Sequence, residues 1–234
     1  MAPVPQAAIQ APDGLEQVLR HPAVWRGRAP AGGGGPVVAS GNQALDEALP
    51  GGGWPLGGLT ELLGAVHGAG ELEVLMPALA TLTRAGRLVV WIAPPHIPYA
   101  PALESSGLVL SRVLWLRPAG VADALWAAEQ VLTDAGGGAV LLWADEVGDR
   151  QLRRLQLAAE RGGALGVVFR HIGRAAQPSP AMLRAEVMAR PGGGALRIIK
   201  CRARPPAAPI PLAGEPANYS TPPAWPMDGY RSGP

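Results

Sequence analysis

The chain has 234 residues, 48% of them hydrophobic, yet no uninterrupted apolar run approaches the ~20 residues of a membrane-spanning helix. A single cysteine, Cys201, excludes an internal disulfide framework and is typical of a reducing compartment, so we expect a cytoplasmic protein with no membrane partner. The net charge of +2 is segregated, because residues 1–149 hold seven Arg against fourteen Asp and Glu, whereas residues 150–204 hold eleven Arg and one Lys against two Glu. This surplus predicts contact with a polyanion, with a merely solvated basic face as the equal alternative.

Both ends of the chain differ in composition from its middle. Residues 1–36 form a predicted N-terminal arm, with a short helix at 13–20 that Asp13 can cap and a Gly-rich linker before Pro36. Residues 205–234 are rich in proline and are predicted to be a disordered tail, because such a segment buries too little apolar surface to offset the entropy of ordering. The folded core is therefore expected at residues 37–204.

A glycine-rich loop follows the first strand-like run of the core. The run LTELL at residues 59–63 reads as a buried strand, and apolar residues at helical spacing mark a helix at 72–83. A strand, a glycine-rich loop and a helix are the setting of a P-loop, in which backbone N–H groups hold phosphates. The loop between them runs from Gly64 through Gly68 and Gly70 to Glu71.

The same loop lacks the side chains that phosphoryl transfer requires. A P-loop also needs a lysine on the β- and γ-phosphates and a Ser or Thr hydroxyl on magnesium. The only lysine of the chain is Lys200, far from the loop, and Glu71 would place a negative charge where the γ-phosphate should sit. We therefore predict a degenerate nucleotide loop, no enzymatic activity, and no resident cofactor or metal.

Downstream, apolar strand-like runs alternate with amphipathic helical patterns. This alternation is typical of a mostly parallel sheet covered on both faces, in a doubly wound α/β fold. Two further runs around a Pro-Gly-Gly-Gly turn predict a hairpin that closes the sheet antiparallel. The strands are expected at 87–92, 113–116, 140–143 and 166–169, the helices at 102–106, 121–133 and 149–161, and the hairpin strands at 184–190 and 196–204.

The order of motifs resembles a known family. Residues 40–62, which contain LPGGGWP, look like the approach to the P-loop in the RecA recombinase core. Together with IAPPHIPYAPAL at 92–103 and Trp25-Arg26-Gly27, they resemble the ImuA family of translesion-synthesis-associated proteins, which is RecA-like and related to the SulA division inhibitors. The resemblance covers about residues 13–206 and implies a RecA-like, P-loop-type core.

Carried over by position, the RecA pattern implies further losses in the nucleotide site. The strand that ends, in RecA, near the catalytic glutamate is followed here by Pro94 and Pro95. Asp145 matches the Walker B aspartate, which approaches magnesium, but an N-cap of the following helix is the favoured interpretation. The degenerate nucleotide site then comprises Gly64, Gly68, Gly70, Glu71 and Asp145.

The resemblance also suggests where the basic block acts. In the RecA pattern the loop after the strand matching 166–169 touches single-stranded DNA, and here Arg170 and Arg174 open it. Basic residues matching the last strand reach the nucleotide of a neighbouring RecA subunit; here they are expected to face DNA or another protein. The predicted DNA-binding residues are Arg170, Arg174, Lys200, Arg202 and Arg204. The arginines of helix 149–161 are expected to be a solvated face, and Trp126 to pack in the core.

The resemblance implies a non-catalytic accessory protein of SOS-induced translesion DNA synthesis. Its expected partners are an ImuB-type Y-family-like adaptor, an error-prone replicative-type DNA polymerase and single-stranded DNA. A second copy is a further possible partner, since Trp25 lies in an arm that docks onto the next protomer in RecA proteins. Two alternatives remain open: a SulA-like division inhibitor that binds FtsZ, and a DNA-dependent ATPase or recombinase, against which the missing lysine argues.

Overall fold

The computed structural model describes residues 35–65, 70–190, 193–201 and 208–212. The helix predicted at 13–20 and three of the predicted site residues, Gly68, Arg202 and Arg204, lie outside these ranges.

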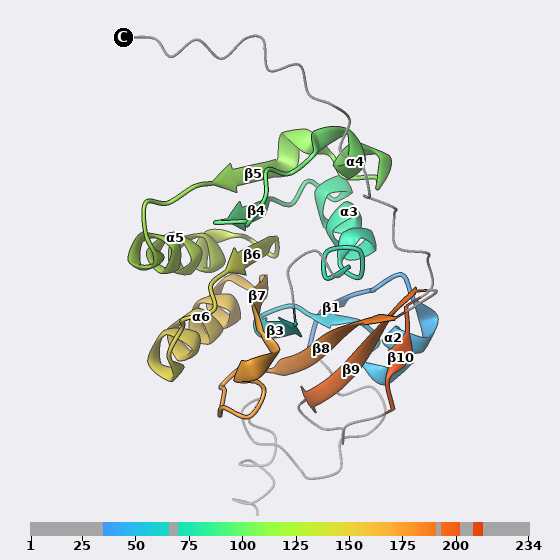
Figure 1. Cartoon of the computed structure of the whole chain (residues 1–234). Coiled ribbons are helices and arrows are strands. Elements are labelled where there is room, and N and C mark those ends of the chain that lie inside the picture. Colours follow the sequence, from blue (N-terminus) through green and yellow to red (C-terminus); the bar gives the residue numbers. More distant parts are fainter. Residues whose placement is uncertain (1–34, 66–69, 191–192, 202–207, 213–234) are drawn as a thin grey trace, which may run out of the picture. The chain divides into compact units, whose positions relative to one another are not determined.

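Within the described residues the core is built on one mixed sheet (Figure 1). Its strands are β3 (Gly58–Gly64), β4 (Val89–Ile92), β5 (Val113–Leu116), β6 (Ala139–Trp143), β7 (Leu165–His171), β8 (Leu183–Arg190), β9 (Gly193–Cys201) and β10 (Ile210–Pro211). They lie in the order β10-β9-β8-β3-β7-β6-β4-β5. From β8 to β5 all neighbours pair parallel, whereas β9 is antiparallel to β8 and to β10. The predicted mostly parallel sheet and its closing antiparallel hairpin are therefore confirmed.

The helices connect the parallel strands. They are α2 (Gln43–Ala48), α3 (Met76–Arg84), α4 (Ala100–Ser105), α5 (Val121–Asp134) and α6 (Asp149–Gly162), with 3-10 turns η1 (Leu110–Arg112) and η2 (Ile172–Arg174). Helix α3 begins four residues later than predicted, because Pro77 lacks an N–H and its ring fits only the first turn of a helix. None of the described helices is both long enough and apolar enough to cross a bilayer.

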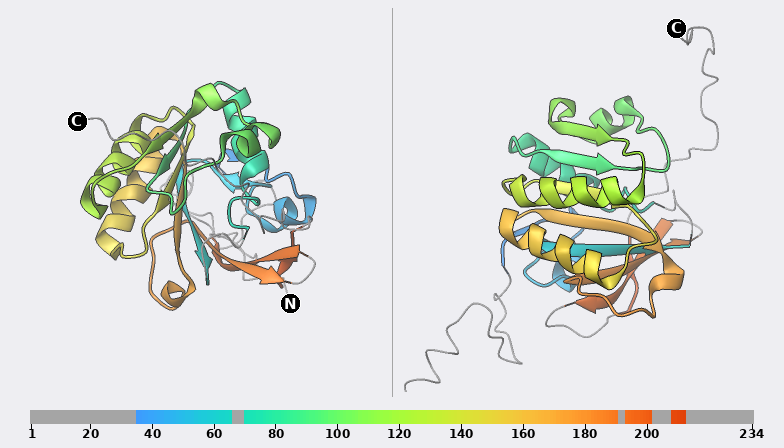
Figure 2. Two further views of the ribbon diagram at one scale, coloured as in Figure 1. Left: turned by 45° about the horizontal axis from the view of Figure 1, so that its top comes forward. Right: turned by 90° about the vertical axis from the view of Figure 1, so that its left-hand side faces the viewer.

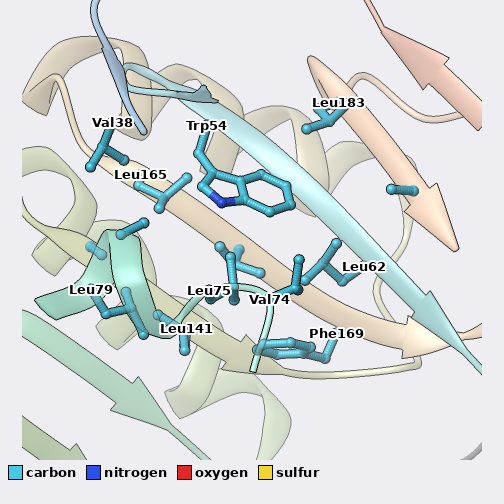
Figure 3. Close-up of a cluster of buried hydrophobic side chains, with 14 of the residues drawn as sticks. Val38, Trp54, Leu62, Val74, Leu75, Leu79, Leu141, Leu165, Phe169 and Leu183 are labelled. Atoms are coloured by element: carbon cyan, nitrogen blue, oxygen red, sulfur yellow. The ribbon is translucent and has the colours of Figure 1, made fainter. Parts of the chain in front are cut away.

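Each face of the sheet carries its own apolar core (Figure 2). Helices α5 and α6 cover one face, where the small residues Ala128 and Ala159 allow close packing. Helix α3, α2 and the two-stranded sheet of β1 (Val37–Val38) and β2 (Trp54–Pro55) cover the other. Figure 3 shows Trp54 in this second core, where its side chain is fully buried. The two-sided coverage explains why the parallel strands read as continuous apolar runs.

The core extends past the boundary predicted at residue 204. Strand β10 pairs with β9, Ile210 is buried, and the Leu212 N–H donates a hydrogen bond of 2.9 Å to the Gly194 carbonyl. Residues 210–211, predicted as part of a disordered tail, are therefore a strand of the sheet.

Candidate nucleotide loop and basic surface

The glycine-rich loop leaves the central strand of the sheet, at the carboxyl end of β3. Gly64 ends that strand, and Gly70 has a φ of +91°, a backbone conformation that favours glycine. Glu71 is buried, so its side chain is not presented to solvent. Turns occupy residues 71–75, and α3 begins only at Met76. In a phosphate-binding loop the helix N-terminus directly follows the glycines. Here four residues lie between Glu71 and the start of the helix.

Asp145 lies just after β6, and its carboxylate is hydrogen-bonded to residues at the end of β7 and just after it. Its carboxylate accepts a hydrogen bond of 2.7 Å from the His171 N–H and one of 3.1 Å from the Arg174 guanidinium. Partial burial raises the pKa of Asp145. The two donors and the charges of Arg174 and Arg170 lower it by more, so the pKa lies below that of an ordinary aspartate. The N-cap of α6 is Gly148, so the interpretation of Asp145 as that cap was wrong.

A buried ionic cluster joins three neighbouring strands. Glu61 of β3 is fully buried and pairs with Arg170 of β7, at 2.7 Å between Oε1 and Nη1, and with Arg184 of β8. Arg170 also donates to the backbone carbonyls of Asp145 and Val147. A carboxylate buried in an apolar strand requires such partners, since an unpaired buried charge is very costly.

This cluster contradicts the role predicted for Arg170. Its side chain is only 2% exposed and its guanidinium donors are already bonded, so it is not available to a DNA phosphate. The sequence contained a signal that was not used: Glu61 interrupts the apolar strand LTELLG, and a charge at that position needs a buried partner.

The RecA pattern predicts a DNA-contacting loop at residues 170–180, but Arg170 lies within β7, and the segment from His171 to Pro180 is hydrogen-bonded to residues of the sheet. Arg184 donates to the carbonyls of Arg174, Ala175 and Gln177, at 2.9–3.0 Å. The Lys200 ammonium donates to the Ser179 carbonyl at 2.6 Å. Of the predicted DNA-binding residues that the structure describes, Arg170 is thus buried, Arg174 is ion-paired and Lys200 is bonded to a loop carbonyl.

Among the residues of the basic block (150–204) that the structure describes, arginines without an ion pair lie on α6. Arg150, Arg153 and Arg161 are exposed, and they have no ion pair within the described ranges. By contrast, Arg154 pairs with Glu129 of α5, and Arg197 pairs with Glu186 across the β8–β9 hairpin.

Next to α6, Trp126 of α5 is 64% exposed, so the prediction that it packs in the core was wrong. Helix α5 buries Ala124, Ala128 and Leu132 against the sheet, and Trp126 lies on a different side of the helix.

Known proteins with similar sequences belong to the two families that the motifs resemble, ImuA and SulA. Residues 64–166 match the family model of the cell division inhibitor SulA. Protein ImuA of Caulobacter vibrioides is 35% identical over 139 residues, which are 57% of each chain. SulA of Yersinia pestis is 32% identical over 98 residues, which are 42% of this chain and 58% of that protein. The matches therefore span a little over half the length of these relatives. The chain is similar to protein ImuA over more than half of its length and contains a SulA-like segment at residues 64–166, as its motifs predicted.

Proposed function

We propose that the protein is a non-catalytic accessory protein of SOS-induced translesion DNA synthesis. It scaffolds a mutagenic complex with an ImuB-type adaptor and an error-prone replicative-type polymerase, on a RecA-like core that contacts single-stranded DNA. The 35% identity to ImuA over 139 residues carries this proposal.

The degenerate nucleotide loop supports a scaffold rather than a motor. Lys200, the only lysine of the chain, lies on β9 and is bonded to the Ser179 carbonyl. The groups that stabilise a transferring phosphoryl are missing from the loop. We predict that the purified protein has no ATP turnover above background, with or without single-stranded DNA, in a phosphate-release assay. Glu71→Ala should leave that rate at background. A magnesium-dependent, DNA-stimulated rate that Asp145→Ala abolishes would show instead that the protein is an ATPase.

The partner is tested by pairwise two-hybrid interaction with the ImuB-type adaptor and with FtsZ of the same organism. The proposal predicts a signal with the adaptor and none with FtsZ. A SulA-like division inhibitor is the second candidate, favoured by the family model over residues 64–166, and it predicts the reverse. A signal with FtsZ alone therefore rejects the accessory role.

A further inference from the structure

One exposed aromatic residue lies on the layer that carries the open arginines. Trp126 is 64% exposed, whereas Trp54, Trp91 and Trp143 are 0%, 2% and 8% exposed. Figure 2 shows α5 and α6 lying side by side on one face of the sheet. Trp126 therefore combines a large exposed ring with a neighbouring basic helix.

The ion pair between α5 and α6 places Trp126 relative to the arginines. Glu129 of α5 pairs with Arg154 of α6 across the gap between the two helices. Trp126 precedes Glu129 by three residues and Arg150 precedes Arg154 by four, so each lies one turn away on the same side of its helix. Both helices connect parallel strands of one sheet and run in the same direction, which puts Trp126 and Arg150 at the same level.

The arginines extend from this level along α6. Arg150, Arg153 and Arg161 are exposed, and from the first to the last the helix advances about 16 Å. Several acids lie near this stripe, among them Asp149, which is exposed and lies one turn before Arg153 on α6. Glu160 accepts a hydrogen bond of 2.8 Å from Gln156, and Asp123 is exposed one turn before Trp126.

We propose that this surface, formed by Trp126, Arg150, Arg153 and Arg161, is a binding site for single-stranded nucleic acid. The indole stacks on a base, and the guanidinium groups bind the phosphates that follow along the strand. The inference rests on the proposed function and moves its DNA contact from the segment after β7 to the outer side of α5 and α6.

The chemistry of the surface favours a nucleic-acid strand over a protein helix. An amphipathic helix needs a continuous apolar groove for residues at i, i+3, i+4 and i+7. The gap between α5 and α6 is instead bridged by the charged pair of Glu129 and Arg154, and on α6 the exposed Leu157 lies among arginines. A single aromatic platform with spaced cations suits a strand whose sequence is not read.

Fluorescence anisotropy with a labelled oligo-dT and the full chain tests the site. Trp126→Leu should weaken binding roughly 5- to 150-fold, the range for the loss of one stacked base, and Trp126→Phe should recover most of it. The triple change of Arg150, Arg153 and Arg161 to Gln should flatten the log–log salt dependence by about two units, from about 0.7 for each phosphate contact. Asp123→Asn should strengthen binding. Changing Arg84, Arg112 and Arg117 to Gln is the control with the same charge change, and it should leave the slope near that of the wild type.

Each other outcome overturns the site, and the adaptor assay shows whether the proposed function falls with it. If the slope drops only when Lys200, Arg202 and Arg204 are changed to Gln, DNA binds elsewhere and the accessory role stands. If the wild type binds no oligonucleotide, the site is rejected. A two-hybrid signal with the adaptor that the α6 triple variant abolishes would then make the surface a protein interface. If the wild type neither binds the oligonucleotide nor gives a signal with the adaptor, both proposals are rejected.

Discussion

Among single residues, Glu61 is a buried carboxylate whose loss should be measurable as a change in stability. It is fully buried between Arg170 and Arg184, so its removal leaves two guanidinium groups without their counter-charge. We predict that Glu61→Gln lowers the free energy of unfolding by about 3–5 kcal/mol, the usual cost of breaking a buried pair from one side. Urea denaturation followed by circular dichroism measures it.

Glu186→Gln is the matched control, since it breaks a pair with Arg197, whose side chain is half exposed. Such surface pairs contribute about 0–1 kcal/mol. Equal losses for the two variants would mean that the Glu61 cluster adds nothing beyond a surface contact.

Asp145 gives the segment after β7 a dependence on pH. Its pKa is lower in the folded protein than in the unfolded chain, so its contribution to stability is present above the unfolded value of about 3.9. That contribution is lost as the pH falls through the folded value. We predict that the amide resonance of His171, which donates to this carboxylate, shifts below about pH 4, and that Asp145→Asn abolishes the shift. A resonance that titrates identically in the variant would assign the shift to another group.

Residue-level roles were the least predictable part of the site. The arginine of β8 that meets Glu61 is 123 residues away along the chain, and no local pattern links the two. The charge surplus of residues 150–204 is evident from the sequence. The sequence does not show which arginines form buried or cross-strand ion pairs and which are exposed on α6. Trp126 was misplaced because an aromatic residue within a helical pattern is usually a core residue.

At the scale of elements, prediction succeeded where periodicity extended over a whole element. Strand β5 was predicted with both ends correct, and α5 and α6 to within one residue, because their apolar spacing and flanking glycines mark them plainly. The short pieces α2, β1, β2 and β10 were not predicted. Strands of two residues carry no measurable alternation, and their existence depends on partners elsewhere in the chain.

The segment from His171 to Pro180 is predicted to be rigid, unlike the DNA-contacting loop that the RecA pattern suggests. Its carbonyls accept hydrogen bonds from Arg184 and Lys200. Lys200→Met removes the bond to Ser179 and should accelerate amide hydrogen exchange around that residue. Arg197→Met changes an exposed residue of the same strand and should not. A wild-type segment that already exchanges at the rate of a free peptide would contradict this anchoring.

At the scale of the whole molecule, the alternation of apolar strands and helices predicted an α/β fold with a mostly parallel sheet and an antiparallel hairpin, and the observed sheet confirms that much. The action of the protein does not follow from the fold, because related α/β cores serve both nucleotide hydrolysis and partner binding. The proposed accessory role depends on the similarity to ImuA, on the absence of a lysine from the glycine-rich loop and on the exposed arginines of α6.

We propose that the protein supports mutagenic lesion bypass without hydrolysing nucleotide. The most direct test is the frequency of mutations induced by ultraviolet light in a deletion strain, complemented with the wild-type gene or with Glu71→Ala. For a non-catalytic accessory protein, deletion should reduce induced mutation to the spontaneous level, and both genes should restore it equally. Induced mutation that persists in the deletion strain, while damaged cells no longer arrest division, would contradict the account and identify a division inhibitor.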